Sequence, residues 1–190
     1  MDPIRTPRLI LRSFSVSDAE AIFAIFSDEE MNRFLPWFPV KTMDEAVDFF
    51  HSRYCQTGNG YRYAICMEDD IPIGYIGIDG GESHDLGYGL LPRFWHRGIA
   101  TEAVRALLAK ARSDGLPYAT ATHDIQNIRS GSVMKGAGMS YRYSYRELWQ
   151  PKGIPAVFRM YQINLSDSDA PTYMGYWERF EEHLIEECVQ

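Results

Sequence analysis

The segment Trp95-His-Arg-Gly-Ile-Ala-Thr-Glu102 places an arginine and a glycine directly before a helical pattern. At the start of a helix, unpaired backbone N–H groups and the positive end of the helix dipole together attract anions. Gly98 and Ala100 would let a ligand approach the backbone closely, and Arg97 could neutralise a phosphate. The spacing therefore predicts a cradle for a diphosphate, and a solvated helix start that binds nothing is the alternative.

Other patterns that could carry chemistry are incomplete. Gly87-Tyr-Gly89 begins like a dinucleotide fingerprint, but Pro92 stands where the third glycine belongs, and no P-loop pattern occurs. Ser130-Gly-Ser132 lacks the glycine that precedes the serine in a nucleophile elbow. The five histidines show no paired metal spacing, so we expect no metal site.

Length and charge limit the class of protein. The chain has 190 residues, of which 45% are hydrophobic and 24% charged, as in an ordinary globular domain. Its 19 basic and 26 acidic residues give a net charge of -7, which disfavours a nucleic-acid partner. Residues 166–190 hold seven acids against Arg179, so residues 1–165 are nearly neutral, with 18 basic and 19 acidic residues. We therefore expect a domain over 1–165 and an acidic extension over 166–190.

Cysteine spacing and hydropathy indicate the compartment. Cys55, Cys66 and Cys188 are far apart and form no C-x-x-C pair, which argues against a disulfide framework and a zinc site. The longest uncharged apolar stretch, 71–78, is too short to cross a membrane, and the first residues do not resemble a signal peptide. These features predict a cytoplasmic protein with no membrane partner.

Periodicity predicts the elements that must position the diphosphate cradle. Runs rich in β-forming residues predict strands at 9–14, 61–67, 71–78, 85–91, 118–122, 140–149 and 156–165. Helical spacing and capping patterns predict helices that begin near Ser17 and Thr42, the longest helix over 100–111, a short one over 127–135 and a terminal acidic one over 172–189.

Two of these segments carry a family resemblance. Leu90-Leu-Pro-x-x-Trp-x-Arg-Gly-Ile-Ala-Thr-Glu-Ala103 resembles the acetyl-CoA-binding motif of the GNAT superfamily of N-acetyltransferases. Asn127-x-x-Ser130, followed by Lys135-Gly-Ala-Gly-Met139, resembles the next helix of that family. Thr6-Pro-Arg-Leu-Ile-Leu-Arg12 and Leu35-Pro-Trp-Phe-Pro39 resemble the branch of the ribosomal-protein alanine N-acetyltransferases. The resemblance spans about residues 5–165.

The resemblance implies an α+β fold and a cosubstrate, acetyl-CoA. The expected fold is a mixed, mostly antiparallel central sheet whose middle strands, 85–91 and 118–122, splay apart, with flanking helices and a C-terminal helical extension. Pantetheine would lie in the gap. By resemblance, the residues that bind acetyl-CoA are Leu90 and Leu91 through their backbone, Arg97, Gly98, Ile99, Ala100 and Thr101 around the pyrophosphate, and Asn127.

The catalytic residues are less well determined. In many relatives a tyrosine donates the proton to the departing thiolate, but this chain has Met134 there, so the resemblance points to Ser130, with a helix-surface serine as the alternative reading. The resemblance places the base near Glu147, which could instead be an exposed strand residue paired to an arginine. Rival bases are His84, Asp85 and His123, and a water relay without an obligatory base is also open.

The expected activity is acetyl transfer from acetyl-CoA to a primary amine by direct attack within a ternary complex. Trp37 and Phe38, together with Trp149, could line the amine pocket because aromatic faces suit cations, although packing is the commoner use of such residues. The acceptor could be a protein N-terminus or a small amine, and a homodimer is left open. The rival hypothesis is a catalytically degenerate sensor that binds CoA, favoured by Trp95 at the first motif position, where the family usually has glutamine or arginine.

Overall fold

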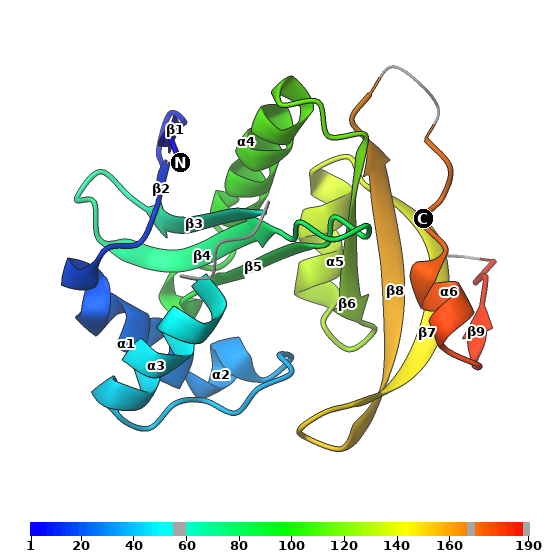
Figure 1. Ribbon diagram of the computed structural model, residues 1–190, viewed down its shortest axis with the longest axis horizontal. Coiled ribbons are helices and arrows are strands. Elements are labelled where there is room, and N and C mark those ends of the chain that lie inside the picture. Colours follow the sequence, from blue (N-terminus) through cyan, green and yellow to red (C-terminus); the bar gives the residue numbers. More distant parts are fainter. Residues whose placement is uncertain (55–59, 167–169, 188–190) are drawn as a thin grey trace.

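Two twisted sheets lie side by side in the computed structural model, which describes residues 1–54, 60–166 and 170–187 (Figure 1). The first sheet has the antiparallel order β1 (Ile4–Arg5), β2 (Ile10–Arg12), β3 (Tyr61–Cys66), β4 (Pro72–Ile78) and β5 (Leu86–Leu90). The second has the antiparallel order β6 (Tyr118–Asp124), β8 (Ile154–Asn164), β7 (Ser140–Trp149) and β9 (His183–Leu184). The predicted α+β class is confirmed.

Helices connect and flank the sheets. Before β3 come a 3-10 turn, η1 (Val16–Asp18), and the helices α1 (Ala19–Ser27), α2 (Glu29–Asn32) and α3 (Met43–Tyr54). A second 3-10 turn, η2 (Pro92–Phe94), leads from β5 into the longest helix, α4 (Ile99–Ser113). The short helix α5 (Ile128–Gly136) follows β6, and α6 (Gly175–Arg179) lies in the C-terminal segment.

The middle strands β5 and β6 are splayed, as predicted. Among the described residues, one parallel bridge joins Asp85 to Thr120, and the Thr120 N–H donates to the carbonyl of His84 at 3.2 Å. Beyond that bridge, no ladder is recorded between the described residues of β5 and β6. The edge of β5 therefore keeps backbone groups that a neighbouring strand would otherwise occupy.

One apolar stripe of α4 holds the two sheets together. Ala103, Val104 and Leu107 are buried in a cluster that also contains Ile76 of the first sheet and Tyr161 of the second. Burying a side chain such as leucine contributes about 1.5 to 3 kcal/mol, so this stripe fixes α4, and with it the turn that precedes α4. The helices α1 and α3 contribute to a second cluster with Tyr75 and Leu91.

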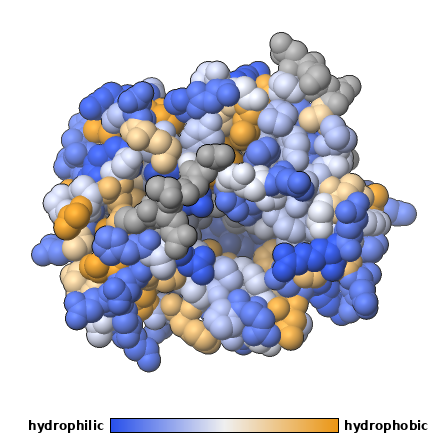
Figure 2. Space-filling model, in the orientation of Figure 1, coloured by the Kyte–Doolittle hydropathy of each residue, from blue (hydrophilic) through white to orange (hydrophobic). Residues whose placement is uncertain are grey.

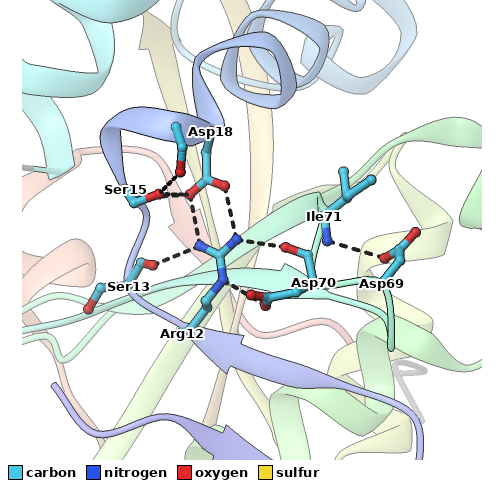
Figure 3. Close-up of polar contacts among 8 residues, drawn as sticks. Arg12, Ser13, Ser15, Asp18, Asp69, Asp70 and Ile71 are labelled. Carbon is cyan, nitrogen blue, oxygen red and sulfur yellow. Dashed lines mark hydrogen bonds and ion pairs between the residues drawn. The ribbon is translucent and has the colours of Figure 1, made fainter.

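The N-terminal strand is fixed by the guanidinium of Arg12, whose five N–H groups all have acceptors (Figure 3). Two of them hold both carboxylate oxygens of Asp18, at 2.8 and 2.9 Å. The others reach Ser13 and, across the sheet, the side chain and carbonyl of Asp70. Arg12 therefore ties β2 to η1 and to the turn between β3 and β4.

The predicted terminal helix over 172–189 is wrong in length, because α6 has only five residues. Phe180 leaves the helix with an extended backbone, and its ring stacks on that of Tyr145 at 4.8 Å between centroids. The chain then forms β9 on the edge of β7, and the carboxylate of Glu186 pairs with Arg159. The aromatic residues of this segment have the spacing of one helix face, but they cover β7 and β8 from a short helix followed by extended chain.

Candidate active site

A cavity of about 430 Å³ opens between β5, the start of α4, the start of α5 and the helix α2. Figure 2 shows this face of the molecule hollowed near its centre, between the two sheets. Of the twelve residues predicted to bind acetyl-CoA, to act in catalysis or to line the amine pocket, the structure brings eight into this lining: Leu90, Arg97, Gly98, Ile99, Ala100, Thr101, Asn127 and Ser130. The remaining four lie elsewhere.

The start of α4 has the open geometry that an anion needs. Gly98 caps the helix in the left-handed region, at φ +72°, where a side chain would be strained. The Arg97 carbonyl accepts a hydrogen bond of 2.9 Å from Arg8, whose guanidinium also pairs with Glu102. This network fixes the turn, while the N–H groups of the first helical turn are directed toward the cavity end of α4.

The edge of β5 offers the backbone N–H of Leu90 to the gap between the sheets. In an antiparallel pair, successive residues direct their backbone groups to opposite edges. Because the Leu91 N–H donates to Ile73 on β4 at 3.0 Å, the groups of Leu90 point toward the gap. The Leu90 carbonyl is already held by the indole N–H of Trp95, at 2.7 Å. The Leu90 N–H is therefore the group available for an amide or thioester oxygen.

At the opposite wall, Asn127 and Ser130 share the first turn of α5. The Asn127 side-chain oxygen caps the helix by accepting from the Ser130 N–H at 3.3 Å, which leaves its amide N–H groups for other partners. The phenol of Tyr88, on β5, donates to the Ser130 carbonyl at 2.8 Å and lies 3.0 Å from the Ser130 hydroxyl. Tyr88 thus spans the cavity from one wall to the other.

Four residues predicted for the site do not line this cavity. Leu91 is buried in the cluster under α1, and its N–H is used within the sheet. Trp37 donates its indole N–H to Asn32 at 2.9 Å and packs against Phe49, whereas Phe38 is 62% exposed. Glu147 is half-buried on β7.

The environment of Glu147 is more typical of a general base than of an exposed carboxylate on a strand. Burial raises the pKa of Glu147, while the charge of Arg179 opposes that shift. The two arginines considered as its partners are occupied, because Arg146 pairs with Glu182 and Arg159 pairs with Glu186.

The rival bases lie in closed surroundings. Burial raises the pKa of the Asp85 carboxyl to about 7, and this residue sits at the vertex where the sheets join. Burial lowers the pKa of His123, and an added Cβ on Gly131 would lie 2.6 Å from the His123 Nε2 atom. His123 is therefore sealed beneath α5. His84 packs against Tyr118, with ring centroids 5.2 Å apart.

Sequence reasoning missed several residues that line the cavity. Tyr88 belongs to the predicted strand and shares a face with the buried Leu86 and Leu90, which indicates that it faces the interior but does not reveal its contact with α5. Arg129 lies over the Trp95 ring at 4.0 Å. No periodic signal marked the contribution of α2, which comprises Glu30, Met31 and, just beyond its end, Phe34.

Three further findings concern the described residues as a whole. Within the described ranges, no cluster of three or more histidine, cysteine or acidic side chains could hold a metal ion. No helix among the described residues is long and apolar enough to span a bilayer. Cys66 is buried and free, whereas Cys55 and Cys188 lie outside the described residues.

Comparison with known families gives one match over most of the chain. The family model described as an acetyltransferase (GNAT) domain matches residues 8–140. The curated Bacillus subtilis protein YoaA, an uncharacterised N-acetyltransferase, is 29% identical over 169 residues, which cover 84% of this chain and 95% of that protein. A second uncharacterised N-acetyltransferase of B. subtilis, YnaD, is 29% identical over 155 residues, which cover 79% of this chain and 89% of that protein.

Solved structures share the fold at low identity. A GNAT-family acetyltransferase from Bacillus anthracis aligns with a TM-score of 0.76 and 22% identity, over 86% of this chain and 99% of its own. RimL, a ribosomal L7/L12 α-N-protein acetyltransferase solved with CoA, aligns with a TM-score of 0.73 and 18% identity, covering 86% and 98%. MccE, a microcin C7 self-immunity acetyltransferase solved with acetyl-CoA and AMP, aligns with a TM-score of 0.73 and 16% identity, over 84% of this chain and 93% of its own.

Proposed function

The chain belongs to the GNAT acetyltransferase family, and we propose that it moves the acetyl group of acetyl-CoA to a primary amine by direct attack in a ternary complex. The observation that carries this proposal is the convergence of three features on one cavity. They are the open start of α4, the gap-facing edge of β5 at Leu90, and the polar side chains that begin α5. Acetyl-CoA needs all three, since the start of α4 suits its diphosphate, the side chains of α5 suit its extended amide chain, and the Leu90 edge suits its thioester.

Each wall of the cavity would have a separate role in binding acetyl-CoA. The N–H groups at the start of α4, with Arg97, would bind the pyrophosphate. The Asn127 amide would bind pantetheine, and the Leu90 N–H would stabilise the negative charge that develops on the thioester oxygen. Oxyanion donors of this kind contribute about 3 to 4 kcal/mol in other acyl-transfer enzymes.

The chemical step needs a neutral amine and a stabilised thiolate. We propose Glu147 as the group that takes the amine proton, directly or through water, because burial raises its pKa and so makes the carboxylate a stronger base. Ser130 would face the departing sulfur from α5. Trp37 and Phe38, in the loop beyond α2, remain candidates for lining the pocket that binds the amine.

The acceptor class is proposed only as far as a primary amine. Proteins of the same fold act on both kinds of acceptor, since RimL is named for a ribosomal protein and another relative is a Vibrio cholerae spermidine N-acetyltransferase solved with CoA and spermine. A panel that contains N-terminal peptides, amino acids and polyamines, with release of free thiol as the readout, tests both classes. A sensor that binds CoA without turnover would release none.

Acetyl-CoA binding itself can be tested by thermal stability. A ligand at about 100 times its Kd stabilises a protein by about 2.7 kcal/mol, which is roughly 5 to 10 °C in Tm for a chain of this size. We expect Gly98→Glu to abolish that shift, because a carboxylate there would repel the pyrophosphate. The matched control is Gly115→Glu, which places the same strained residue at φ +87° just beyond the other end of α4, away from the cavity. An unchanged Tm of the unmodified protein at millimolar acetyl-CoA would refute the proposal.

A further inference from the structure

Two hydroxyl groups from opposite walls meet inside the cavity. Tyr88 comes from β5, and Ser130 comes from α5; their side-chain oxygens are 3.0 Å apart, and both residues line the cavity. Tyr88 lies two residues before Leu90 on the same face of the strand. A thioester bound at Leu90 would therefore have its sulfur close to this pair.

We propose that the hydroxyl groups of Tyr88 and Ser130 act as one unit, in which the phenol of Tyr88 holds Ser130 in place and the Ser130 hydroxyl donates a hydrogen bond to the thiolate of CoA as it departs. This inference rests on the proposed acetyl transfer and extends it to the fate of the leaving group. In that step the nitrogen–carbon bond forms and the carbon–sulfur bond breaks, with its electron pair remaining on sulfur. Glu147 takes the proton lost by the amine and releases it to solvent, and the thiolate takes up a proton from solvent, so the products are the amide and CoA thiol.

The hydrogen-bond arrangement suits such a donor. The phenol of Tyr88 has one proton and two acceptors on Ser130, the carbonyl at 2.8 Å and the hydroxyl at 3.0 Å. When the phenol donates to the carbonyl, the Ser130 hydroxyl is free to direct its own proton to the sulfur. Burial raises the pKa of Tyr88, so the phenol keeps its proton at neutral pH and acts as a donor, never as a base.

Binding of CoA measures this role without knowledge of the amine. CoA carries a thiol with an ordinary pKa of about 8.5, whereas acetyl-CoA and desulfo-CoA have no group that titrates there. If the pair stabilises the thiolate, CoA affinity should rise about tenfold relative to acetyl-CoA between about pH 6 and pH 9, because each unit by which the bound thiol pKa falls is worth a factor of ten. The affinity of desulfo-CoA should follow that of acetyl-CoA.

The variants Tyr88→Phe and Ser130→Ala should each flatten this pH dependence, and the double variant should do no more than either. With a productive amine, each should also lower turnover about tenfold or more, the usual cost of losing a hydrogen bond to a charged group. Tyr143→Phe is the matched control, since it removes another buried phenol hydroxyl, bonded to the Tyr173 carbonyl at 2.8 Å, outside the cavity.

The outcomes separate the two proposals. If Tyr88→Phe binds CoA with the pH dependence of the unmodified protein, the donor role is overturned and the acetyltransferase proposal stands. An equal loss of affinity for CoA and acetyl-CoA at every pH would show that Tyr88 only fixes α5 to β5, which also overturns it. If the unmodified protein binds neither ligand, both proposals fail. Should Tyr88→Phe not fold, Ser130→Ala carries the same test.

Discussion

Glu147 is proposed as the base, although it does not line the cavity that would bind acetyl-CoA. It lies on β7 on the same face as Tyr145, where burial raises its pKa and the charge of Arg179 lowers it. A carboxylate whose pKa approaches the working pH accepts a proton more readily from an ammonium group. Glu147 therefore fits a base that reaches the amine from the second sheet, opposite the cosubstrate.

We expect Glu147→Gln to lower turnover roughly 100-fold near neutral pH, since general base catalysis commonly contributes that much. Its Kd for acetyl-CoA should stay the same, because Glu147 does not line the cosubstrate cavity. Steady-state kinetics with an amine identified by the panel, together with calorimetric binding, checks both expectations. Glu178→Gln, at an exposed position of α6, is the control. Unaltered turnover in Glu147→Gln would mean that the base lies elsewhere or that water relays the proton without an obligatory base.

Individual site residues were predictable where a local pattern marked them. The segment 97–101 is marked by one arginine, one glycine and small residues before a helix, and all five residues line the cavity. Tyr88 has no such marker, because its role depends on which face of β5 points toward α5. Trp37 is an aromatic residue of the kind expected in an amine pocket, yet its indole N–H donates to the Asn32 side chain and fixes the loop.

At the scale of elements, periodicity predicted most of the fold. The strand at 140–149 has the expected bounds, and the longest helix begins one residue before the expected Ala100 and ends near Gly115. The C-terminal segment was mispredicted because rings at helical spacing can equally cover a sheet from a short helix and an extended strand. Its contacts with Tyr145 and Arg159 are long-range, and local propensity cannot reveal them.

The Arg12 junction gives a prediction about how elements are joined. We expect Arg12→Lys to lower the free energy of unfolding by about 1 to 3 kcal/mol, because a lysine cannot reproduce the planar fork on the buried Asp18 carboxylate and hydrogen bonds to charged groups are worth that much. The control is Arg62→Lys, since Arg62 pairs with the exposed Asp79 at 3.7 Å. Surface pairs of that kind contribute about 0 to 1 kcal/mol. Urea unfolding of both variants makes the comparison, and equal losses would contradict the assigned role of Arg12.

At the scale of the whole molecule, three parts meet at Asp85. Its backbone bridges the first sheet to Thr120 of the second, and the Tyr176 side chain of the C-terminal segment interacts with its carboxyl and lowers the pKa of that group. Burial, and then the charge of Asp79, raises the pKa of this carboxyl to about 7. The junction of the sheets and the extension thus contains an acid that the folded protein prefers to keep neutral.

This preference makes stability depend on pH in a defined direction. An unfolded aspartate ionises near pH 3.9, so between about pH 4 and pH 7 the folded protein holds a proton that the unfolded chain has lost. The contribution of Asp85 to stability therefore falls as pH rises through that window and stays low above it. Asp85→Asn removes the titration, so this variant should gain stability relative to the unmodified protein between pH 5 and pH 8.

The comparison between variants is needed because other groups change stability in the opposite sense. Burial lowers the pKa of His123, so the contribution of that residue rises as pH increases toward about 6.5. Urea unfolding of Asp85→Asn and of the unmodified protein, each at pH 5 and at pH 8, isolates the contribution of the Asp85 carboxyl to stability. Asp79→Asn should show an intermediate slope, since it removes only the repulsive charge. Identical pH dependence in Asp85→Asn and the unmodified protein would mean that the carboxyl ionises normally and that the junction tolerates its charge.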